Sequence, residues 1–245
     1  MNQIPEAYTE LAELAGGFIH DLKNHLSTLG LNLQLLAEDF ADAQTQRERR
    51  ALQRVHRLQG ECHRLVETSN DFLRYARIQD LYLEPTRLDD ILSEMVDFFT
   101  PTAREANVRI HCYVPVDLPS ILMDRELFKQ AMLNLMLNSE QAMPEGGELT
   151  LQARPDRGGV ALDVIDTGTG IPPEIMGKIF KPFHTTKPGG NGLGLPTVKK
   201  VIRAHGGTID VQSSVEHGTK FMIWLPGEMS LPAQFLNLPT TILPS

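Results

Sequence analysis

Two histidines, His20 and His25, are the residues best suited to chemistry in the first part of the chain, within the segment GGFIHDLKNHL at residues 16–26. Histidine changes charge near neutral pH, and its neutral ring carries a nucleophilic nitrogen. Leucines recur around this segment at helical spacing, yet two adjacent glycines precede His20. Because glycine costs a helix about 1 kcal/mol relative to alanine, the pair indicates a site with a purpose other than helix stability.

Helical geometry distinguishes the two histidines. At about 100° per residue, the apolar stripe of this helix is centred on Phe18, Leu22, Leu29 and Leu36. His20 falls almost opposite the stripe and is expected to face solvent or a partner, whereas His25 falls on its edge and is expected to pack in a bundle. Since helical side chains lean toward the N-terminus, His20 should lie over Gly16 and Gly17, which leave the surface beside the ring clear.

Asn134 and Asn138 are separated by four positions in a segment with helical periodicity. Residues at this spacing lie on one face of a helix, and an amide oxygen can ligate a Mg²⁺ ion that bridges phosphates. Polar residues on an amphipathic helix are also often only solvated, so the pair by itself is weak support for a metal site.

The segment Asp166-Thr-Gly168-Thr-Gly170 follows the apolar run 160–165, which predicts a strand. A carboxylate at a strand end can accept a hydrogen bond from an exocyclic amine such as that of adenine, and glycines let the backbone approach a ring. An ordinary turn fits these residues equally well, so both interpretations stand at this point.

Residues 180–195 combine phenylalanines, a lysine and closely spaced glycines. Lys187 can meet a phosphate as a point charge, and the phenylalanines can anchor a mobile loop. Gly190, Gly192 and Gly194 open a predicted helix, where free N–H groups and the helix dipole favour an anion. The segment has neither the Lys-Ser/Thr of a P-loop nor the spacing of a dinucleotide-binding fingerprint.

Two long amphipathic helices position the histidine segment. Apolar steps of three and four predict helices over residues 6–40 and 47–78, joined by a short polar segment at 41–46. Such helices form an antiparallel hairpin. Because two helices alone cannot bury both stripes, we expect a four-helix bundle of two chains, with packing against the rest of the same chain as the alternative.

The second part of the chain predicts an α+β sandwich with a mostly antiparallel sheet. The expected helices are 88–99, 124–142 and 194–205, and the expected strands are 108–114, 120–123, 147–154, 159–165, 207–213 and 219–225. Proline disfavours helix at the residue before it, so Pro85 marks the boundary between the two parts. We therefore expect domains at residues 1–80 and 81–228 and an irregular tail at 229–245.

Composition and charge argue against several classes of protein. The net charge of −8 disfavours nucleic acid as the main partner. Cys62 and Cys112 give no disulfide framework and fit a reducing compartment. No apolar run approaches the roughly 20 residues of a membrane span and no signal peptide opens the chain, so we expect a cytoplasmic protein without a membrane partner.

The order and spacing of these segments, with Gly218-Thr219 as the last, resemble the N, G1, F, G2 and G3 boxes of the GHKL ATP-binding domain. With the hairpin in front, residues 10–226 look like the catalytic core of a two-component sensor histidine kinase. The segments HDLKN and PFHTTK, with GNGLGL, are most similar to the nitrogen-regulation (NtrB-like) soluble kinases. The resemblance implies a dimerisation and phosphotransfer (DHp) hairpin followed by a GHKL (Bergerat) α/β sandwich with a flexible ATP lid.

The resemblance also implies a role for each residue of the histidine box. His20 would take the phosphoryl group of ATP and pass it to an aspartate of a response regulator receiver domain. Asp21 would accept a hydrogen bond from one ring nitrogen and leave the other unprotonated. Asn24 matches the position that orients water when family members dephosphorylate the regulator. In the commonest family version a proline stands where this chain has His25, so an expected kink is missing.

In the ATP domain, the resemblance implies that Asn138 binds Mg²⁺, Asp166 reads adenine and Thr219 supports the adenine pocket. The other expected nucleotide contacts are Asn134, Gly168, Gly170, Phe180, Lys187, Gly190, Gly192, Leu193 and Gly194. The expected cofactors are ATP and Mg²⁺, and the expected partners are a receiver domain and a second copy of the chain. The first helix begins close to Met1, so we expect either a separate sensor partner or the excised core of a longer protein.

Three other functions fit these residues less well. A GHKL ATPase needs a glutamate four positions before the metal asparagine to activate water, and this chain has Asn134 there, which cannot take a proton. A scaffold protein with a decayed ATP domain would have lost the glycines or Asn138, which are present. A serine kinase of the anti-sigma-factor type would lack the hairpin that carries His20.

Overall fold

The computed structural model describes residues 6–78, 81–187 and 190–227, without the side chains of residues 6–18, His20 and Arg77. The described residues form two compact units. The first contains those up to Arg77 together with Thr186–Leu193, and the second contains those of Ile78–Thr185 and from Gly194 onward. The predicted irregular tail at 229–245 lies outside the described residues.

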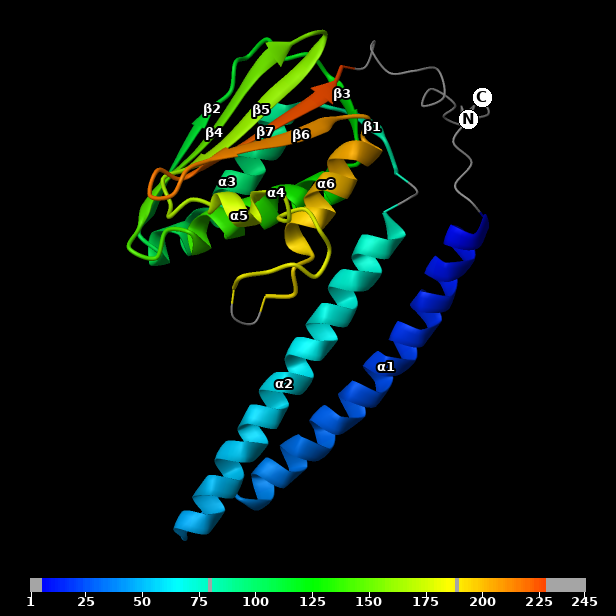
Figure 1. The fold of residues 1–245 in the computed structure, drawn as a ribbon, viewed down its shortest axis with the longest axis vertical. Coiled ribbons are helices and arrows are strands. Elements are labelled where there is room, and N and C mark those ends of the chain that lie inside the picture. The colour runs from blue at the N-terminus through cyan, green and yellow to red at the C-terminus, as the bar shows by residue number, and fades with distance from the viewer. Residues whose placement is uncertain (1–5, 79–80, 188–189, 228–245) are drawn as a thin grey trace, which may run out of the picture. The chain divides into compact units, whose positions relative to one another are not determined.

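Helices α1 (Glu6–Asp39) and α2 (Gln46–Arg77) form the predicted hairpin in the first unit (Figure 1). The start of α2 is fixed by reciprocal capping: Thr45 Oγ1 accepts a hydrogen bond from the Glu48 N–H at 3.2 Å, and the Glu48 carboxylate accepts one from the Thr45 N–H at 2.9 Å. These backbone donors lower the pKa of the Glu48 carboxyl. None of the helices in the described part of the chain combines the length and apolar character that a membrane crossing needs.

The apolar stripe of the hairpin is covered on one side only. Ile19, Leu26 and Val55 are buried. Among the described side chains, five leucines of the predicted stripes remain exposed: Leu22 by 37%, Leu29 by 53%, Leu36 by 41%, Leu58 by 53% and Leu65 by 51%. His25 is exposed as well, so its expected packing in a bundle is not formed within one chain.

The second unit is built on a five-stranded sheet in the order β2-β4-β5-β7-β6. Its strands are β2 (Val108–Tyr113), β4 (Gly147–Asp156), β5 (Gly159–Asp166), β6 (Thr208–Ser213) and β7 (Thr219–Pro226). Strands β2 and β4 pair in parallel and the other neighbours are antiparallel. A second, two-stranded sheet joins β1 (Glu84–Thr86) to β3 (Ile121–Met123) in antiparallel register.

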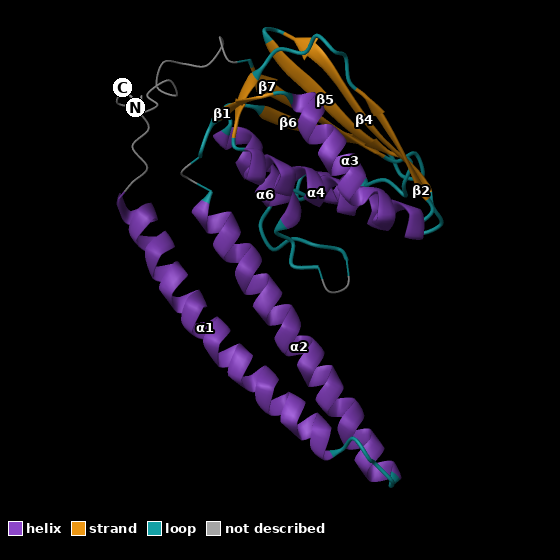
Figure 2. Ribbon diagram, turned by 180° about the vertical axis from the view of Figure 1, so that it is seen from behind, coloured by secondary structure: helices purple, strands orange, loops and turns teal. Residues whose placement is uncertain are grey.

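Three helices cover one face of the five-stranded sheet: α3 (Leu88–Glu105), α4 (Arg125–Gln141) and α6 (Gly194–Ala204) (Figures 1 and 2). Side chains alternate along β5, so that Leu162 and Val164 enter the core beneath these helices. Between them Asp163 points to the other face, where Arg154 and Lys220 pair with one of its oxygens at 2.7 and 2.8 Å.

The predicted α+β class is confirmed, and the differences are local. Helix α3 extends beyond the predicted end and contains Pro101, because Phe99 and Ala103 bury their side chains in the core. Strand β1 was interpreted as a boundary because it contains Pro85, yet its backbone pairs with β3. The short helix α5 (Pro173–Met176) was not predicted.

Candidate functional site

The best-defined polar group of the second unit is the Asp166 carboxylate, where β5 ends opposite the first residue of β7. Its Oδ1 accepts hydrogen bonds from the N–H groups of Gly168 and Thr219, both at 3.0 Å. Its Oδ2 accepts one from the Ser139 hydroxyl at 3.2 Å. Asp166 is only 4% exposed, so these donors both stabilise the carboxylate and fix its orientation.

The glycines after Asp166 are required because the backbone of other segments of the chain packs closely against them. A Cβ at Gly168 would lie 2.7 Å from the carbonyl oxygen of Ala142. Gly170 has a φ of +73° and a Cβ there would collide with the carbonyl oxygen of Ser214. The turn is therefore formed, and its geometry lets the Gly168 and Thr219 N–H groups hold Asp166, while the reading of a base by Asp166 stays a prediction.

The side chain of Thr219, whose N–H donates directly to Asp166, is held by a second serine, Ser213. The Ser213 hydroxyl lies 3.0 Å from Thr219 Oγ1, donates to the Gly218 carbonyl at 2.8 Å and accepts from the Ile171 N–H at 2.8 Å. Sequence reasoning missed Ser213 and Ser139, since a serine on a helix or strand carries no spacing signal. Ser139 had only its position after Asn138 to point to it.

Asn134 and Asn138 meet the start of α6. A Cβ built on Gly194 would lie 3.8 Å from both Asn134 Oδ1 and Asn138 Nδ2. Asn138 is followed in the sequence by Ser139, whose hydroxyl donates to Asp166. The candidate residues for the metal ion (Asn138), the phosphates (Gly194) and the base (Asp166) therefore adjoin one another. The first turn of α6 offers the N–H groups of Gly194 and Leu195, since Pro196 has none.

The chemistry of these amides limits what metal they suit. Among the described residues there is no group of three or more His, Cys, Asp or Glu side chains that could hold a metal ion. A hard cation such as Mg²⁺ is bound through one or two protein oxygens, several waters and substrate phosphates. The amide of Asn138 beside the anion-favouring start of α6 fits that kind of cation.

The two phenylalanines of the predicted anchor behave differently. Phe180 packs against the core, and the Lys199 ammonium of α6 lies 4.8 Å from the centre of its ring. Phe183 has a positive φ of 62° and is 58% exposed. Phe180 therefore holds the start of the segment against α6, and Phe183 does not.

The remaining predicted contacts fall in the segment Thr186–Leu193 of the first unit. Within it, Gly192 has a φ of +67° and Asn191 Oδ1 accepts a hydrogen bond from the Leu193 N–H at 3.0 Å. The structure does not place Lys187, Gly190, Gly192 and Leu193 relative to the residues around Asp166.

The histidine box lies inside α1. Asp21 and Asn24 are exposed on this helix, and the Asn24 carbonyl accepts a hydrogen bond from the Thr28 hydroxyl at 3.0 Å. The backbone of His20 is helical, and its side chain lies outside the described residues. Gly16 and Gly17 also lie within the helix, so the pair does not interrupt it.

Comparisons with known proteins agree on one family. A family model described as histidine kinase-, DNA gyrase B-, and HSP90-like ATPase matches residues 123–229. The sensor histidine kinase ZraS of Escherichia coli (strain K12) is 32% identical over 222 residues, which cover 90% of this chain and 46% of ZraS. The chain thus spans about half the length of the curated relatives that it matches.

Solved structures give the same result. Full-length ShkA in complex with AMPPNP has a TM-score of 0.69 and 29% identity, covering 87% of this chain and 45% of that one. The catalytic domain of the histidine kinase ThkA has a TM-score of 0.55 and 30% identity, covering 60% of this chain and 96% of that one.

Proposed function

The chain belongs to the histidine kinases, and on that premise we propose that it is an ATP-dependent protein-histidine kinase of a two-component system. One observation carries the proposal: polar residues of β5, α4 and α6 adjoin one another, because Ser139 donates to Asp166 and the neighbouring Asn138 lies beside Gly194. Asp166 suits a base, Asn138 a metal ion and the N-terminus of α6 at Gly194 the phosphates. The same chain carries a histidine on a long helix.

ATP is the substrate in this proposal. Asp166 Oδ2 accepts a hydrogen bond from the exocyclic amine of adenine, with Thr219 supporting the pocket and Gly168 and Gly170 shaping the turn beneath it. The first turn of α6 at Gly194 would bind the phosphates, and the ammonium of Lys187 is proposed to neutralise part of their charge. The glycines Gly190 and Gly192 and Leu193 belong to the lid that covers them.

A magnesium ion held by Asn138, with Asn134 beside it, would neutralise charge on the phosphates when bound. The rest of the chemistry belongs to the histidine box. The unprotonated nitrogen of His20 attacks the γ-phosphorus, a P–N bond forms, the bond to the β-phosphate oxygen breaks, and ADP leaves. Asp21 accepts a hydrogen bond from the other ring nitrogen and so fixes the reactive tautomer.

Water activation is disfavoured by the same residues. At the position where a GHKL ATPase carries its general base, this chain has Asn134, whose amide has no basic site for a proton. A nucleophile from the hairpin is therefore the better acceptor. Asn24, one turn after His20, is proposed to orient water for dephosphorylation of the regulator.

The expected partners follow from the hairpin. The exposed leucines Leu22, Leu29, Leu36, Leu58 and Leu65 support a second copy of the chain, which would cover them in a four-helix bundle. The receiver domain of a response regulator would take the phosphoryl group from His20. Domains at 1–80 and 81–228, the tail at 229–245 and the nitrogen-regulation subgroup stay predictions.

Labelling with radioactive Mg-ATP tests the proposal directly. We expect a protein-bound phosphate that is lost in acid and stable in base, as a P–N bond requires. The His20→Gln protein should not be labelled, and His25→Gln should be labelled normally as the matched control. Normal labelling of His20→Gln would rule out this acceptor, and steady phosphate release without labelled protein would indicate an ATPase instead.

A further inference from the structure

Asn191 fixes a turn of the proposed lid through its own side chain. Its Oδ1 accepts a hydrogen bond from the Leu193 N–H at 3.0 Å. Gly192, which lies between them, has a φ of +67°, a left-handed conformation that glycine adopts without strain. A side chain that bonds the backbone in this way satisfies a donor locally. Residues 191–193 are called the lid turn here, and the Leu193 N–H within it is already occupied.

The same amide attaches the lid turn to α2. Asn191 Nδ2 donates a hydrogen bond to Oδ2 of Asp71, 120 positions away in the sequence and within the same compact unit. A carboxylate offers only acceptors, so the NH₂ group of Asn191 must face Asp71 and the amide oxygen is left for the Leu193 N–H. Asp71 therefore sets the orientation in which Asn191 occupies that N–H.

The face of α2 that carries Asp71 is polar and open to water. A hollow of about 330 Å³ lies beside the contact and is lined by residues of α2 and, on the lid side, by Asn191. Most of its α2 residues recur at steps of three and four and so share one helix face: Arg64, Glu67, Thr68, Asp71 and Arg74. Asp71 and Asn191 are both half-buried. Because a single hydrogen bond in contact with water contributes only a modest net stabilisation, a bound ligand can displace it.

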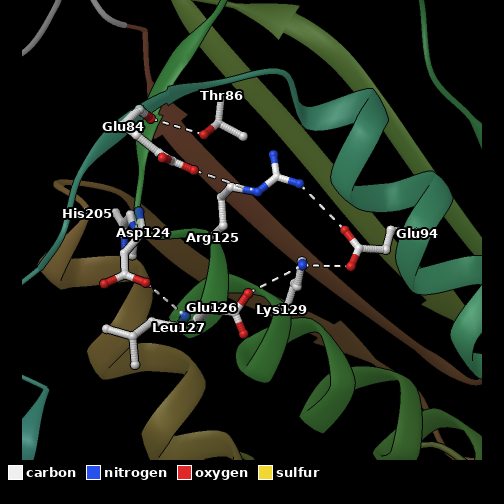
Figure 3. A network of polar contacts seen from close by, with 9 residues as sticks. All are labelled: Glu84, Thr86, Glu94, Asp124, Arg125, Glu126, Leu127, Lys129 and His205. Atoms are coloured by element: carbon white, nitrogen blue, oxygen red, sulfur yellow. Dashed lines mark hydrogen bonds and ion pairs between the residues drawn. The ribbon is translucent and has the colours of Figure 1, made fainter.

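Helix α6, which begins directly after the lid turn, is anchored independently of Asp71. At its far end His205 is 2% exposed, and its Nε2 accepts a hydrogen bond from the Asp124 N–H at the start of α4 at 3.0 Å (Figure 3). Nδ1 therefore carries the proton and donates it to the Val201 carbonyl at 2.8 Å. Burial lowers the pKa of this ring, which favours the neutral form that both contacts require. Release of Asn191 would thus leave these contacts of α6 in place.

We propose that Asp71 docks the lid turn on α2 in competition with the nucleotide. The inference rests on the proposed kinase function, in which the N–H groups of the lid and of the first turn of α6 meet the phosphates. While Asp71 holds Asn191, the Leu193 N–H is bonded within the turn and cannot meet a phosphate. Docking and nucleotide binding therefore exclude each other, and each lowers the apparent affinity of the other. Asp71 and Asn191 are positioning residues, since neither touches the reacting atoms.

Binding of a non-hydrolysable ATP analogue tests the competition. Asp71→Ala removes the acceptor and should bind the analogue about two- to ten-fold more tightly than the wild type, as the loss of one competing hydrogen bond implies. Glu67→Ala is the matched control, because Glu67 carries the same charge one turn earlier on the same face of α2, and its affinity should equal that of the wild type. Equal or weaker binding by Asp71→Ala would overturn the proposal.

A double-mutant cycle separates docking from simple repulsion between Asp71 and the phosphates. In Asn191→Ala the docking contact is absent, so adding Asp71→Ala should change the affinity no further. A gain of the same size with and without Asn191 would show a direct effect of the charge and would refute docking.

Hydrogen exchange at the Leu193 amide tests the contact without ATP. Asn191→Ala removes the acceptor and Asp71→Ala releases its orientation, so exchange should accelerate in both, at least about three-fold in Asp71→Ala. An unchanged rate in Asp71→Ala would show that the carboxylate does not hold the turn. If the wild type bound no analogue, the proposed kinase function would fall and the competition with it. Binding by the wild type with unchanged affinity in Asp71→Ala would refute the competition alone.

Discussion

At the scale of one residue, the two carboxylate oxygens of Asp166 have different surroundings. Its Oδ1 is occupied by the Gly168 and Thr219 N–H groups, which only a glycine-containing turn and an antiparallel neighbour can bring together. Its Oδ2 lies toward Ser139, beside the metal candidate Asn138. The turn holds the carboxylate in one orientation, which the proposed reading of adenine would require.

His205 should make the stability of the second unit depend on pH. Its folded pKa is lowered, so below the ordinary histidine pKa the unfolded chain binds a proton that the folded chain refuses. The contribution of this ring is therefore fully present above that value and is lost as pH falls toward the folded pKa, with a slope of at most about 1.4 kcal/mol per pH unit.

Chemical unfolding of the wild type and of His205→Gln, measured in steps between about pH 5 and 8, checks this effect. Glutamine does not titrate, so the wild type should lose stability faster on acidification than the variant. If the free energy of unfolding changed with pH equally in the two proteins, the pKa of His205 would be the same in the folded and unfolded chain, and the prediction would be wrong.

Helix α6 serves two purposes at the scale of an element. Its first residue, Gly194, faces Asn134 and Asn138, and its Lys199 lies over Phe180, which precedes the lid in the sequence. One helix thus follows the proposed lid directly in the sequence and contacts Phe180, which precedes that segment. A cation over an aromatic ring contributes about 0.5–2 kcal/mol of stabilisation. This energy favours one position of the segment after Phe180 without immobilising it.

Replacing Lys199 should therefore loosen the segment after Phe180 and weaken ATP use. For Lys199→Met we expect a KM for ATP raised roughly two- to ten-fold, as about 0.5–1.4 kcal/mol implies, with a smaller change in kcat. Lys199→Arg keeps a cation over the ring and should restore the wild-type value. Lys178→Met is the control for removal of an exposed lysine nearby in sequence, and an equal effect there would contradict the argument.

At the scale of the whole molecule, a single chain leaves part of the apolar stripe of its hairpin uncovered. Ile19, Leu26 and Val55 fill the contact between α1 and α2, while leucines on the adjoining part of the stripe remain in water. Contiguous apolar surface of this kind is uncommon on a monomer. A second hairpin is the cover that the periodicity of both helices favours.

Charges on the uncovered stripe should separate the chains. We expect the wild type to sediment as a dimer and the double variant Leu29→Glu and Leu65→Glu to sediment as a monomer at the same concentration. Leu31→Glu is a matched control, because Leu31 is 57% exposed but lies on the opposite side of α1 by helical geometry. Dimerisation of the double variant, or dissociation of the control, would place the interface elsewhere.

The sequence by itself determined the order and type of nearly all the elements, because a period of 3.6 or 2 is a local property of the chain. It also determined the family, since the HDLKN box, Asn138, Asp166 and the Gly190–Gly194 run occur in order. It failed at β1, where the pairing with β3 overrides the local signal of Pro85, and at the end of α3, which continues to Glu105.

Only the tertiary structure decided which polar residues act together. Ser139 reaches Asp166 across 27 positions, Tyr82 reaches Asp124 across 42, and His205 reaches Asp124 across 81. No spacing rule connects such residues, because each bond depends on where the sheet and helices place two distant backbones. The sequence marks where chemistry can occur, and the long-range packing selects the side chains that hold it in position.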